Sequence, residues 1–234
     1  HSVTRIDSLY GDKAIVQGKS ILKLSMSGVM LMEGGMCSYG VSDTINELYA
    51  AYRNPNIAGI ILEVNSGGGE SVAGDALMSA VKDRNKPLVS VAHLAGSAAY
   101  KGILHSDEIL GITESSRFGS IGTFISLPLN ELKEYAETVL DIYADVSVNK
   151  NIEIREAFKG NFQPMKNLVN KSAISFQESV KELRNLKGSE AKITETLSGG
   201  VFSSNDAKSR GLIDGVASFG EAVKKLEFHI KNQK

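Results

Sequence analysis

Apolar and polar positions follow a repeating pattern through the first half of the chain. Residues 57–62 form an almost continuous apolar run, which is typical of a strand buried on both faces of a sheet. Four segments predict strands: 20–26, 57–64, 88–91 and 108–112. Between these strands the apolar residues follow helical spacing in three segments. The first begins at Ser42, which we expect to cap the helix, and the others cover 72–82 and 97–105. Strands separated by helices of this length predict right-handed β-α-β crossovers and a parallel sheet.

The pattern changes in the second half of the chain. Residues 130–138 predict a helix, 139–144 a strand, and 165–186 a long amphipathic helix. The apolar side of that long helix packs against the same chain or against another subunit. A short helix over 207–211 ends at a glycine, which is a common helix terminator. Because no linker or low-complexity segment interrupts the chain, we expect a single domain over 1–234, with 1–19 a flexible or strand-forming N-terminal segment.

Composition and charge exclude several classes of protein. The 26 Lys and Arg residues balance 27 Asp and Glu, and no basic block stands out, so we expect no nucleic-acid partner. Cys37 is the only cysteine, which excludes an internal disulfide and a cysteine-rich metal site. We expect no metal and no cofactor. The longest apolar candidate, residues 21–32, is interrupted by polar residues and is too short to span a bilayer. We therefore expect a soluble chain, and peripheral contact with a membrane stays open.

The start of the chain bears on its origin. His1 stands where an initiator methionine would be, and no signal-peptide pattern follows. This predicts a processed or truncated chain. The sequence specifies no compartment: the bacterial cytoplasm and a membrane-associated full-length form are both compatible with it.

A glycine-rich turn, Asn65-Ser66-Gly67-Gly68-Gly69-Glu70, follows the buried strand. Consecutive glycines permit positive φ angles and leave backbone N–H groups free to point at a ligand. The turn lacks the Gly-Lys-Ser/Thr ending of a P-loop and the Gly-x-Gly-x-x-Gly spacing of a dinucleotide turn. An oxyanion hole, a phosphate cradle and a plain turn all remain open at this point.

A serine lies in a second turn of small residues, Gly96-Ser97-Ala98-Ala99, after a predicted strand. The order of residues departs from the Gly-x-Ser-x-Gly elbow of α/β-hydrolases. Small neighbours allow a substrate chain to approach the backbone, and the Ala98 N–H at a helix start would stabilise a developing oxyanion. The alternative is an ordinary serine cap at the start of a helix.

A serine nucleophile needs a base, which can be a histidine or a lysine. The four histidines, His1, His93, His105 and His229, are not suitably placed in the sequence. Lys150 could serve if its pKa fell from ~10.4 to about 7–8, which requires burial in the assembled site. A solvated surface lysine is the alternative.

Four motifs, in this order, resemble those of the signal peptide peptidase A family: Asn65-Ser66-Gly67-Gly68-Gly69, Gly96-Ser97-Ala98-Ala99-Tyr100, Arg117-Phe118-Gly119-Ser120-Ile121-Gly122 and Ala207-Lys208-Ser209-Arg210-Gly211-Leu212-Ile213-Asp214. That family includes phage head-maturation proteases and belongs to the superfamily of the Clp proteolytic subunit and the crotonases. The resemblance covers roughly residues 20–223. It implies an α/β fold, a crotonase- and Clp-protease-like β-α-β superhelix with a C-terminal helical extension.

The resemblance also implies roles for particular residues. Ser97 matches the nucleophile, Lys150 the general base, and Ser120 a serine that orients the lysine. Gly68 or Gly69 would supply an oxyanion donor beside Ala98. Lys159 is a rival base, because a glycine-containing segment follows the base in many members and Gly160 follows Lys159 here.

The implied function is a serine endopeptidase with a Ser/Lys dyad, acting on peptide or protein substrates through an acyl-enzyme. Signal-peptide-like and phage-head substrates both remain open, and the family implies a ring-like homo-oligomer. The stretch 26–36 would form part of a substrate groove, a mobile rim, the core or a subunit contact. Two alternatives stand beside this function: a crotonase-type acyl-CoA enzyme using Glu70 and Glu114, and a catalytically silent ring or scaffold protein.

Overall fold

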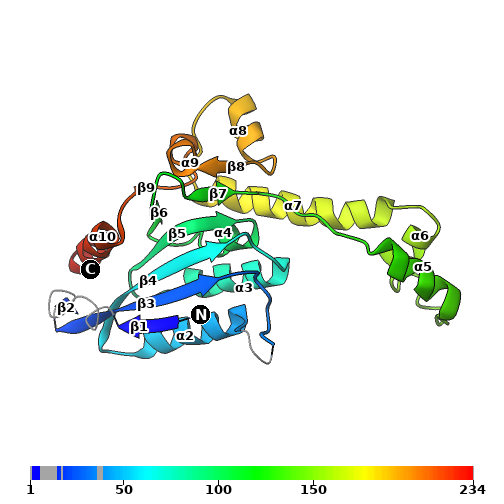
Figure 1. The fold of residues 1–234 in the computed structure, drawn as a ribbon, viewed down its shortest axis with the longest axis horizontal. Helices are drawn as coiled ribbons and strands as arrows, with labels where there is room; N and C mark the ends of the chain where they lie inside the picture. Colours follow the sequence, from blue (N-terminus) through cyan, green and yellow to red (C-terminus); the bar gives the residue numbers. More distant parts are fainter. Residues whose placement is uncertain (1, 6–14, 17, 36–38, 234) are drawn as a thin grey trace. The chain divides into compact units, whose positions relative to one another are not determined.

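The computed structural model describes residues 2–5, 15–16, 18–35 and 39–233. The chain, drawn in Figure 1, forms two compact units. The first unit extends to Ile121 and resumes at Phe176, and the second is Gly122–Ser175. Each unit is described by itself below. The single peptidase domain expected over 1–234 stays a prediction.

The first unit is built on a sheet whose central strands run parallel, as the sequence predicts. Its main order is β1-β3-β4-β5-β6-β9. The parallel strands are β3 (Lys19–Ser27), β4 (Ile57–Ser66), β5 (Leu88–Gly96), β6 (Glu108–Gly111) and β9 (Gly215–Val216). Two short strands pair antiparallel with β3: β1 (Ser2–Arg5) and β2 (Ile15–Val16). Part of the predicted N-terminal segment therefore forms strands.

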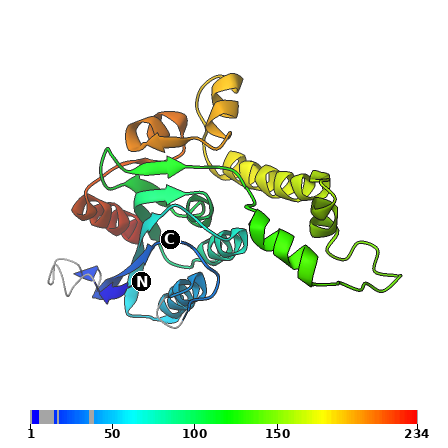
Figure 2. The ribbon, with the colours of Figure 1, turned by 45° about the vertical axis from the view of Figure 1, so that its right-hand side comes forward.

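Helices cover both faces of this sheet, with α10 on the side opposite α2 and α3 (Figure 2). These helices are α2 (Val41–Arg53), α3 (Ser71–Lys82) and α10 (Phe219–Asn232). Successive side chains of a strand point to opposite faces. Ile60 and Leu62 accordingly pack in the core with Leu77 of α3, whereas Ile61 packs with Leu226 of α10. Burial on both faces explains the continuous apolar run of β4.

Strand β5 has two different neighbours along its length on one side. Its first half pairs with β6, and its last residues pair with β7 (Arg117–Gly119). Strand β7 in turn pairs antiparallel with β8 (Val201–Ser203). Gly96 and Gly119 are partners in the β5–β7 register, so the chain leaves the sheet at the same place after both strands.

Shorter helices complete the first unit, and three helices build the second. Those of the first unit are α4 (Ala98–Gly102), α8 (Glu190–Thr196) and α9 (Ser204–Arg210). The second unit holds α5 (Leu129–Thr138), α6 (Ile152–Phe158) and the start of α7 (Gln163–Leu183), which ends in the first unit. In the part of the chain that the structure describes, no helix is both long and apolar enough to cross a membrane.

Two details of the sequence prediction are wrong in the first unit. The N-cap of α2 is Gly40, whose N–H donates to Asp43 Oδ2 at 2.8 Å, so Ser42 lies inside the helix and is not its cap. The helix expected over 97–105 ends earlier, at Gly102. At the first place Gly40 and Ser42 could both have capped the helix. At the second the chain turns more tightly after Gly102, because the Ile103 and Leu104 N–H groups donate to carbonyls three residues earlier.

The strand predicted over 139–144 is also wrong. These residues form no strand, and the side chains of Leu140 and Ile142 are exposed. Strand propensity reflects packing against a neighbouring strand. The described part of the second unit, which holds no strand, offers none.

Candidate active site

Ser97 occupies a strained turn at the end of β5. Its φ of 51° and ψ of −126° are rare for a residue other than glycine. Backbone hydrogen bonds hold the turn: the Ser97 N–H donates to the Gly119 carbonyl at 2.9 Å, and the Lys101 N–H donates to the Ser97 carbonyl at 3.0 Å. The residue is half-buried, and its hydroxyl has no hydrogen-bond partner among the described residues. The turn therefore presents a hydroxyl that the fold itself does not use.

Ser120 repeats this arrangement at the end of the neighbouring strand. Its φ is also 51°, and the preceding Gly119 has a φ of 121°. The Ser120 N–H donates to the Gly200 carbonyl at 2.7 Å. Because Gly96 and Gly119 are register partners, Ser97 and Ser120 follow adjacent positions of two parallel strands. The structure thus brings together two serines that lie far apart in the sequence.

The glycine turn lies directly against Ser97. Gly68 has a φ of +102°, and a Cβ atom built on it would stand 2.8 Å from Ser97 Cβ and 2.9 Å from Ala98 N. No side chain fits at such distances. Gly68 is therefore required both by its backbone conformation and by the close approach of the nucleophile turn.

Several backbone N–H groups around these two turns and the helix starts that follow them are unpaired within the described chain, as is usual where a helix begins. Those of Gly69 and Ala98 donate to no described residue. The Gly68 N–H, by contrast, donates to Ser66 Oγ at 3.1 Å. A bridge to Met30 holds the turn from the other side, since the Met30 N–H donates to the Gly68 carbonyl at 2.9 Å. Unpaired N–H groups near a serine hydroxyl are what an oxyanion hole needs.

A cavity of about 410 Å³ is lined by the segment that contains Met30, the residue that bridges to Gly69 of the glycine turn. Its lining comes from residues 26–31 and 39–41 and from Thr44. Met26 and Met30 are buried, whereas Val29 and Leu31 are exposed. The stretch expected to form a groove, a rim or core therefore supplies both core side chains and a cavity wall. Met36 of this stretch lies outside the described residues, as does Cys37.

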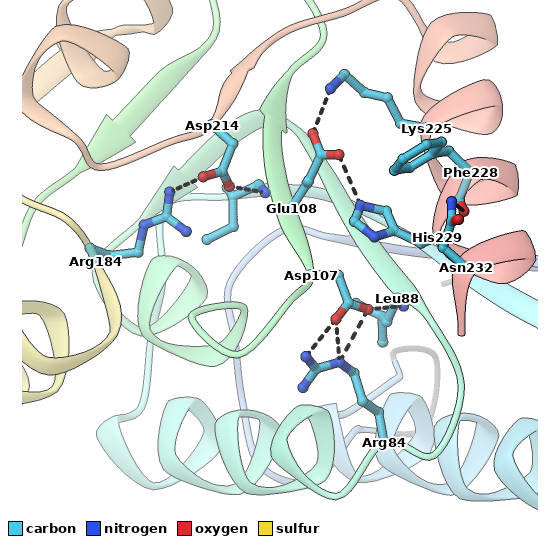
Figure 3. A network of polar contacts seen from close by, with 11 residues as sticks. Arg84, Leu88, Asp107, Glu108, Arg184, Asp214, Lys225, Phe228, His229 and Asn232 are labelled. Carbon is cyan, nitrogen blue, oxygen red and sulfur yellow. Dashed lines mark hydrogen bonds and ion pairs between the residues drawn. The ribbon is translucent and has the colours of Figure 1, made fainter. Parts of the chain in front are cut away.

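The three described histidines have neighbours other than Ser97. His93 Nε2 lies 3.9 Å from Glu63 Oε1, and His229 Nε2 lies 2.9 Å from Glu108 Oε1, at the start of β6 (Figure 3). Burial lowers the pKa of His105, and the charges of nearby Lys82 and Arg84 lower it further. None of the three forms a hydrogen bond with Ser97; His1 lies outside the described residues. Among the described residues no cluster of His, Cys, Asp or Glu could hold a metal ion.

The two lysines proposed as base belong to the second unit. Lys150 is exposed and ends a turn in which its N–H donates to the Ser147 carbonyl at 3.0 Å. Lys159 Nζ forms an ion pair with Glu156 Oε1 at 2.8 Å, and its side chain is 66% exposed. The five other predicted site residues belong to the first unit. The pairing of Ser97 with Lys150 stays a prediction.

Comparison with known proteins identifies the family. A family model described as "Peptidase family S49" matches residues 80–233. The chain belongs to peptidase family S49. The match includes Ser97 and Ser120 and the whole second unit, while the glycine turn precedes it. This confirms the resemblance to signal peptide peptidase A-like proteins seen in the sequence motifs.

Named relatives of this S49 chain are proteases in their descriptions. "Putative protease MJ0651" of Methanocaldococcus jannaschii is 31% identical over 191 residues, which cover 78% of this chain and 60% of the relative. "Protease 4" of Haemophilus influenzae is 28% identical over 196 residues, covering 79% of this chain and 31% of that protein. The S49 chain therefore spans less than two thirds of the length of either relative.

Solved structures show the fold that this S49 chain shares. A Listeria monocytogenes ClpP1 variant aligns with a TM-score of 0.53 at 15% identity, covering 86% of this chain and 94% of that one. An enoyl-CoA hydratase/isomerase from Pseudoalteromonas atlantica aligns with a TM-score of 0.51 at 15% identity, covering 91% and 74%. The predicted α/β Clp-protease and crotonase fold with a parallel sheet is confirmed.

Proposed function

We propose that this S49 chain is a serine endopeptidase whose nucleophile is Ser97. One observation carries the proposal. The chain folds so that Gly68 lies against Ser97 and Ala98, and unpaired N–H groups belong to the same two turns. A strained serine beside unpaired backbone donors is suited to acyl transfer.

The proposed reaction proceeds through an acyl-enzyme. Ser97 Oγ attacks the carbonyl carbon of an extended substrate, and the Oγ–C bond forms as the hydroxyl proton passes to the base. The N–H groups of Ala98 and Gly69 stabilise the oxyanion, and Gly68 is the weaker candidate because Ser66 Oγ already accepts from its N–H. The C–N bond then breaks, and the base returns the proton to the leaving amine. Water hydrolyses the ester by the same steps and frees a carboxylic acid.

The proposal assigns the base to Lys150 and a positioning role to Ser120. A lysine can accept a proton only when it is neutral, so Lys150 must be buried in the assembled site. A neighbouring hydroxyl that fixes the direction of the amine lone pair improves the geometry of proton transfer. The place of Ser120, next to Ser97 at the end of β7, supports this role. Lys159, the rival base, already has a carboxylate partner in Glu156.

The substrates we propose are peptides or proteins that bind in extended form. The cavity lined by Met30 and its neighbours could receive an apolar side chain of such a substrate, because Met30 bridges to Gly69 of the glycine turn. Signal-peptide-like and phage-head substrates both satisfy this description. We also propose a ring-like homo-oligomer, as the family resemblance implies.

The acyl-CoA alternative has less support in the described structure. It needs a carboxylate free to act on a thioester substrate. Glu70 Oε2 instead accepts from the Met32 N–H at 2.6 Å, and Glu114 is an exposed residue of the loop before β7. Neither carboxylate accounts for the two serines in strained turns.

A labelling experiment tests the proposed function. The chain is treated with a fluorophosphonate, and the adduct is located by intact mass and peptide mapping. We expect one adduct, on Ser97, and none in Ser97→Ala, whereas exposed Ser115→Ala should label normally. Hydrolysis of fluorescent casein should fall at least a hundredfold in Ser97→Ala, because the acyl-enzyme cannot form. Turnover of a short acyl-CoA without labelling would support the crotonase alternative, and inertness to both reagents would support a silent scaffold.

A further inference from the structure

Lys101 is a buried cation that the proposed mechanism does not use. It lies on α4, one helical turn beyond Ser97, and is 6% exposed. Transfer of an ammonium group out of water is costly unless other groups compensate its charge. The groups that contact Lys101 therefore indicate the structural role of this residue.

Two contacts compensate the charge of Lys101, and they come from two other helices. Its Nζ forms an ion pair with Asp75 Oδ1 of α3. The same Nζ lies 5.6 Å from the ring centroid of Phe176, on the part of α7 that belongs to the first unit. A cation over an aromatic face is attracted by the ring electrons. One ammonium group thus joins α3, α4 and α7.

The helices α3 and α4 begin at the two turns of the candidate site. Helix α3 starts at Ser71, directly after the glycine turn, and α4 starts at Ala98. The two helices pack closely, since a Cβ atom on Gly74 would stand 2.9 Å from the Ala98 carbonyl oxygen. Any shift of α3 against α4 changes the separation of the Gly69 and Ala98 N–H groups. The Lys101–Asp75 pair spans this same interface.

The ion pair with Asp75 also makes Lys101 unsuitable as a general base. An ammonium group paired with a carboxylate carries its proton and has no lone pair to offer. Lys101 is therefore unsuited to act as the general base for Ser97, although it is only four residues away. Its contribution must come through the placement of other groups.

The geometry points to Lys101 as a positioning residue that holds the two oxyanion donors in register through Asp75. This inference rests on the proposed function, because it assumes that Ser97 is the nucleophile and that Gly69 and Ala98 supply the donors. Oxyanion stabilisation depends on donors lying within a few tenths of an ångström of their working positions. A clamp between the two helices that carry them meets this need.

Two substitutions separate positioning from stability. Lys101→Met keeps the length of the side chain and removes the charge, while Asp75, with a side chain 53% exposed, stays solvated. Its melting temperature should stay close to that of the wild type, because no buried charge is left unpaired. Asp75→Asn leaves the buried ammonium without its carboxylate and should lower the melting temperature more.

The experiment measures the rate constant for phosphonylation of Ser97 by a fluorophosphonate, together with the melting temperature of each variant. We expect Lys101→Met to label about 10- to 100-fold more slowly with its half-saturating probe concentration little changed, as a small displacement of catalytic groups costs about this much. The matched control is Lys225→Met, which removes another ion-paired lysine, on α10. Its partner Glu108 (Figure 3) is the register partner of Val89, at the opposite end of β5 from Ser97. This control should label at the wild-type rate.

Each outcome of this experiment supports or overturns the positioning role of Lys101. A wild-type labelling rate in folded Lys101→Met overturns the positioning role and leaves the proposed function intact. If Lys101→Met does not fold, Lys101→Gln takes its place, since it removes the charge and keeps a polar group beside Asp75: labelling at least fivefold slower supports the clamp, and wild-type labelling overturns it. Absence of an adduct on Ser97 in the wild-type chain overturns the proposed function, and the role of Lys101 with it.

Discussion

At the scale of single residues, the two serines in strained turns are the most informative feature. Each adopts a φ of 51°, a conformation that costs on the order of 1–3 kcal/mol for a residue with a side chain. The fold maintains both turns through backbone hydrogen bonds to Gly119 and Gly200. Glycine would fill either turn with less strain, so the hydroxyl groups themselves account for the presence of serine.

The first prediction concerns the hydroxyl group of Ser120. We expect Ser120→Ala to lower casein hydrolysis by roughly ten- to a thousandfold, the range typical of general acid–base positioning. Slow fluorophosphonate labelling of Ser97 should persist, because the nucleophile is intact. Ser120→Gly relieves the backbone strain and also removes the hydroxyl, so it should be impaired to a similar degree. Near-normal turnover in both variants would show that Ser120 does not position the base and would leave the Ser97–Lys150 dyad alone.

At the scale of elements, hydrogen bonds at helix starts show where local sequence and structure agree. Helix α10 begins with a capping box: the Ser218 side chain accepts from the Glu221 N–H, and Glu221 Oε2 accepts from the Ser218 N–H at 2.8 Å. Hydrogen bonds from the Ser218 hydroxyl and backbone lower the pKa of Glu221. Helix α2 begins at Gly40, whose N–H donates to the Asp43 side chain, although Ser42 is close by.

The second prediction compares these two serines. Ser218→Ala should destabilise the chain by about 1 kcal/mol, the usual cost of losing a helix cap. Ser42→Ala should change stability little, because this position is inside α2 and alanine is the better helix former. Urea unfolding of the two variants measures the difference. Equal losses of stability would show that the Ser218 cap contributes nothing of its own.

The third prediction concerns how the stability of the chain depends on pH through Glu221, the carboxylate of the same capping box. Since the folded-state pKa of Glu221 is lowered, its contribution to stability is present above the unfolded pKa and is lost as pH falls through the folded value. Glu221→Gln should therefore flatten the decline of stability in acid, as followed by melting temperature between about pH 3 and 6. An unaltered decline in Glu221→Gln would assign the acid sensitivity to other carboxylates.

At the scale of the whole molecule, the proposed chemistry needs residues of both compact units. Ser97 and its neighbours belong to the first unit, whereas Lys150 is an exposed residue of the second. A lysine accepts a proton only in its neutral form, and burial is what favours that form. The burial that a base requires must therefore arise in the assembled protein.

The fourth prediction distinguishes the two candidate lysines. Lys150→Met should abolish casein hydrolysis, while Lys159→Met should retain it, since Lys159 already pairs with Glu156 on the surface of α6. Wild-type activity should rise with pH as the lysine base loses its proton, without a limb near ~6.5 from a histidine. An inactive Lys159→Met beside an active Lys150→Met would transfer the role of base.

Much of the fold could be predicted from the sequence because local patterns report burial. The apolar run of β4 and the helical spacing of α3 and α7 follow directly from which faces of each element are covered. The motifs around Ser97 and Ser120 were equally visible, because glycine and small residues mark turns that carry strain or close contact. The sequence by itself thus determined the parallel sheet, most element positions and the candidate serines.

Tertiary structure alone decided how distant segments meet. The contact of Gly68 with Ser97, the register of Gly96 with Gly119, and the Lys101–Asp75 pair each join segments more than 20 residues apart. Local periodicity contains no information on such pairs. The sequence does not distinguish Lys101, because a single lysine on a short helix resembles any solvated one. The absent strand at 139–144 has the same cause: a strand needs a partner, and only the folded chain decides whether one is present.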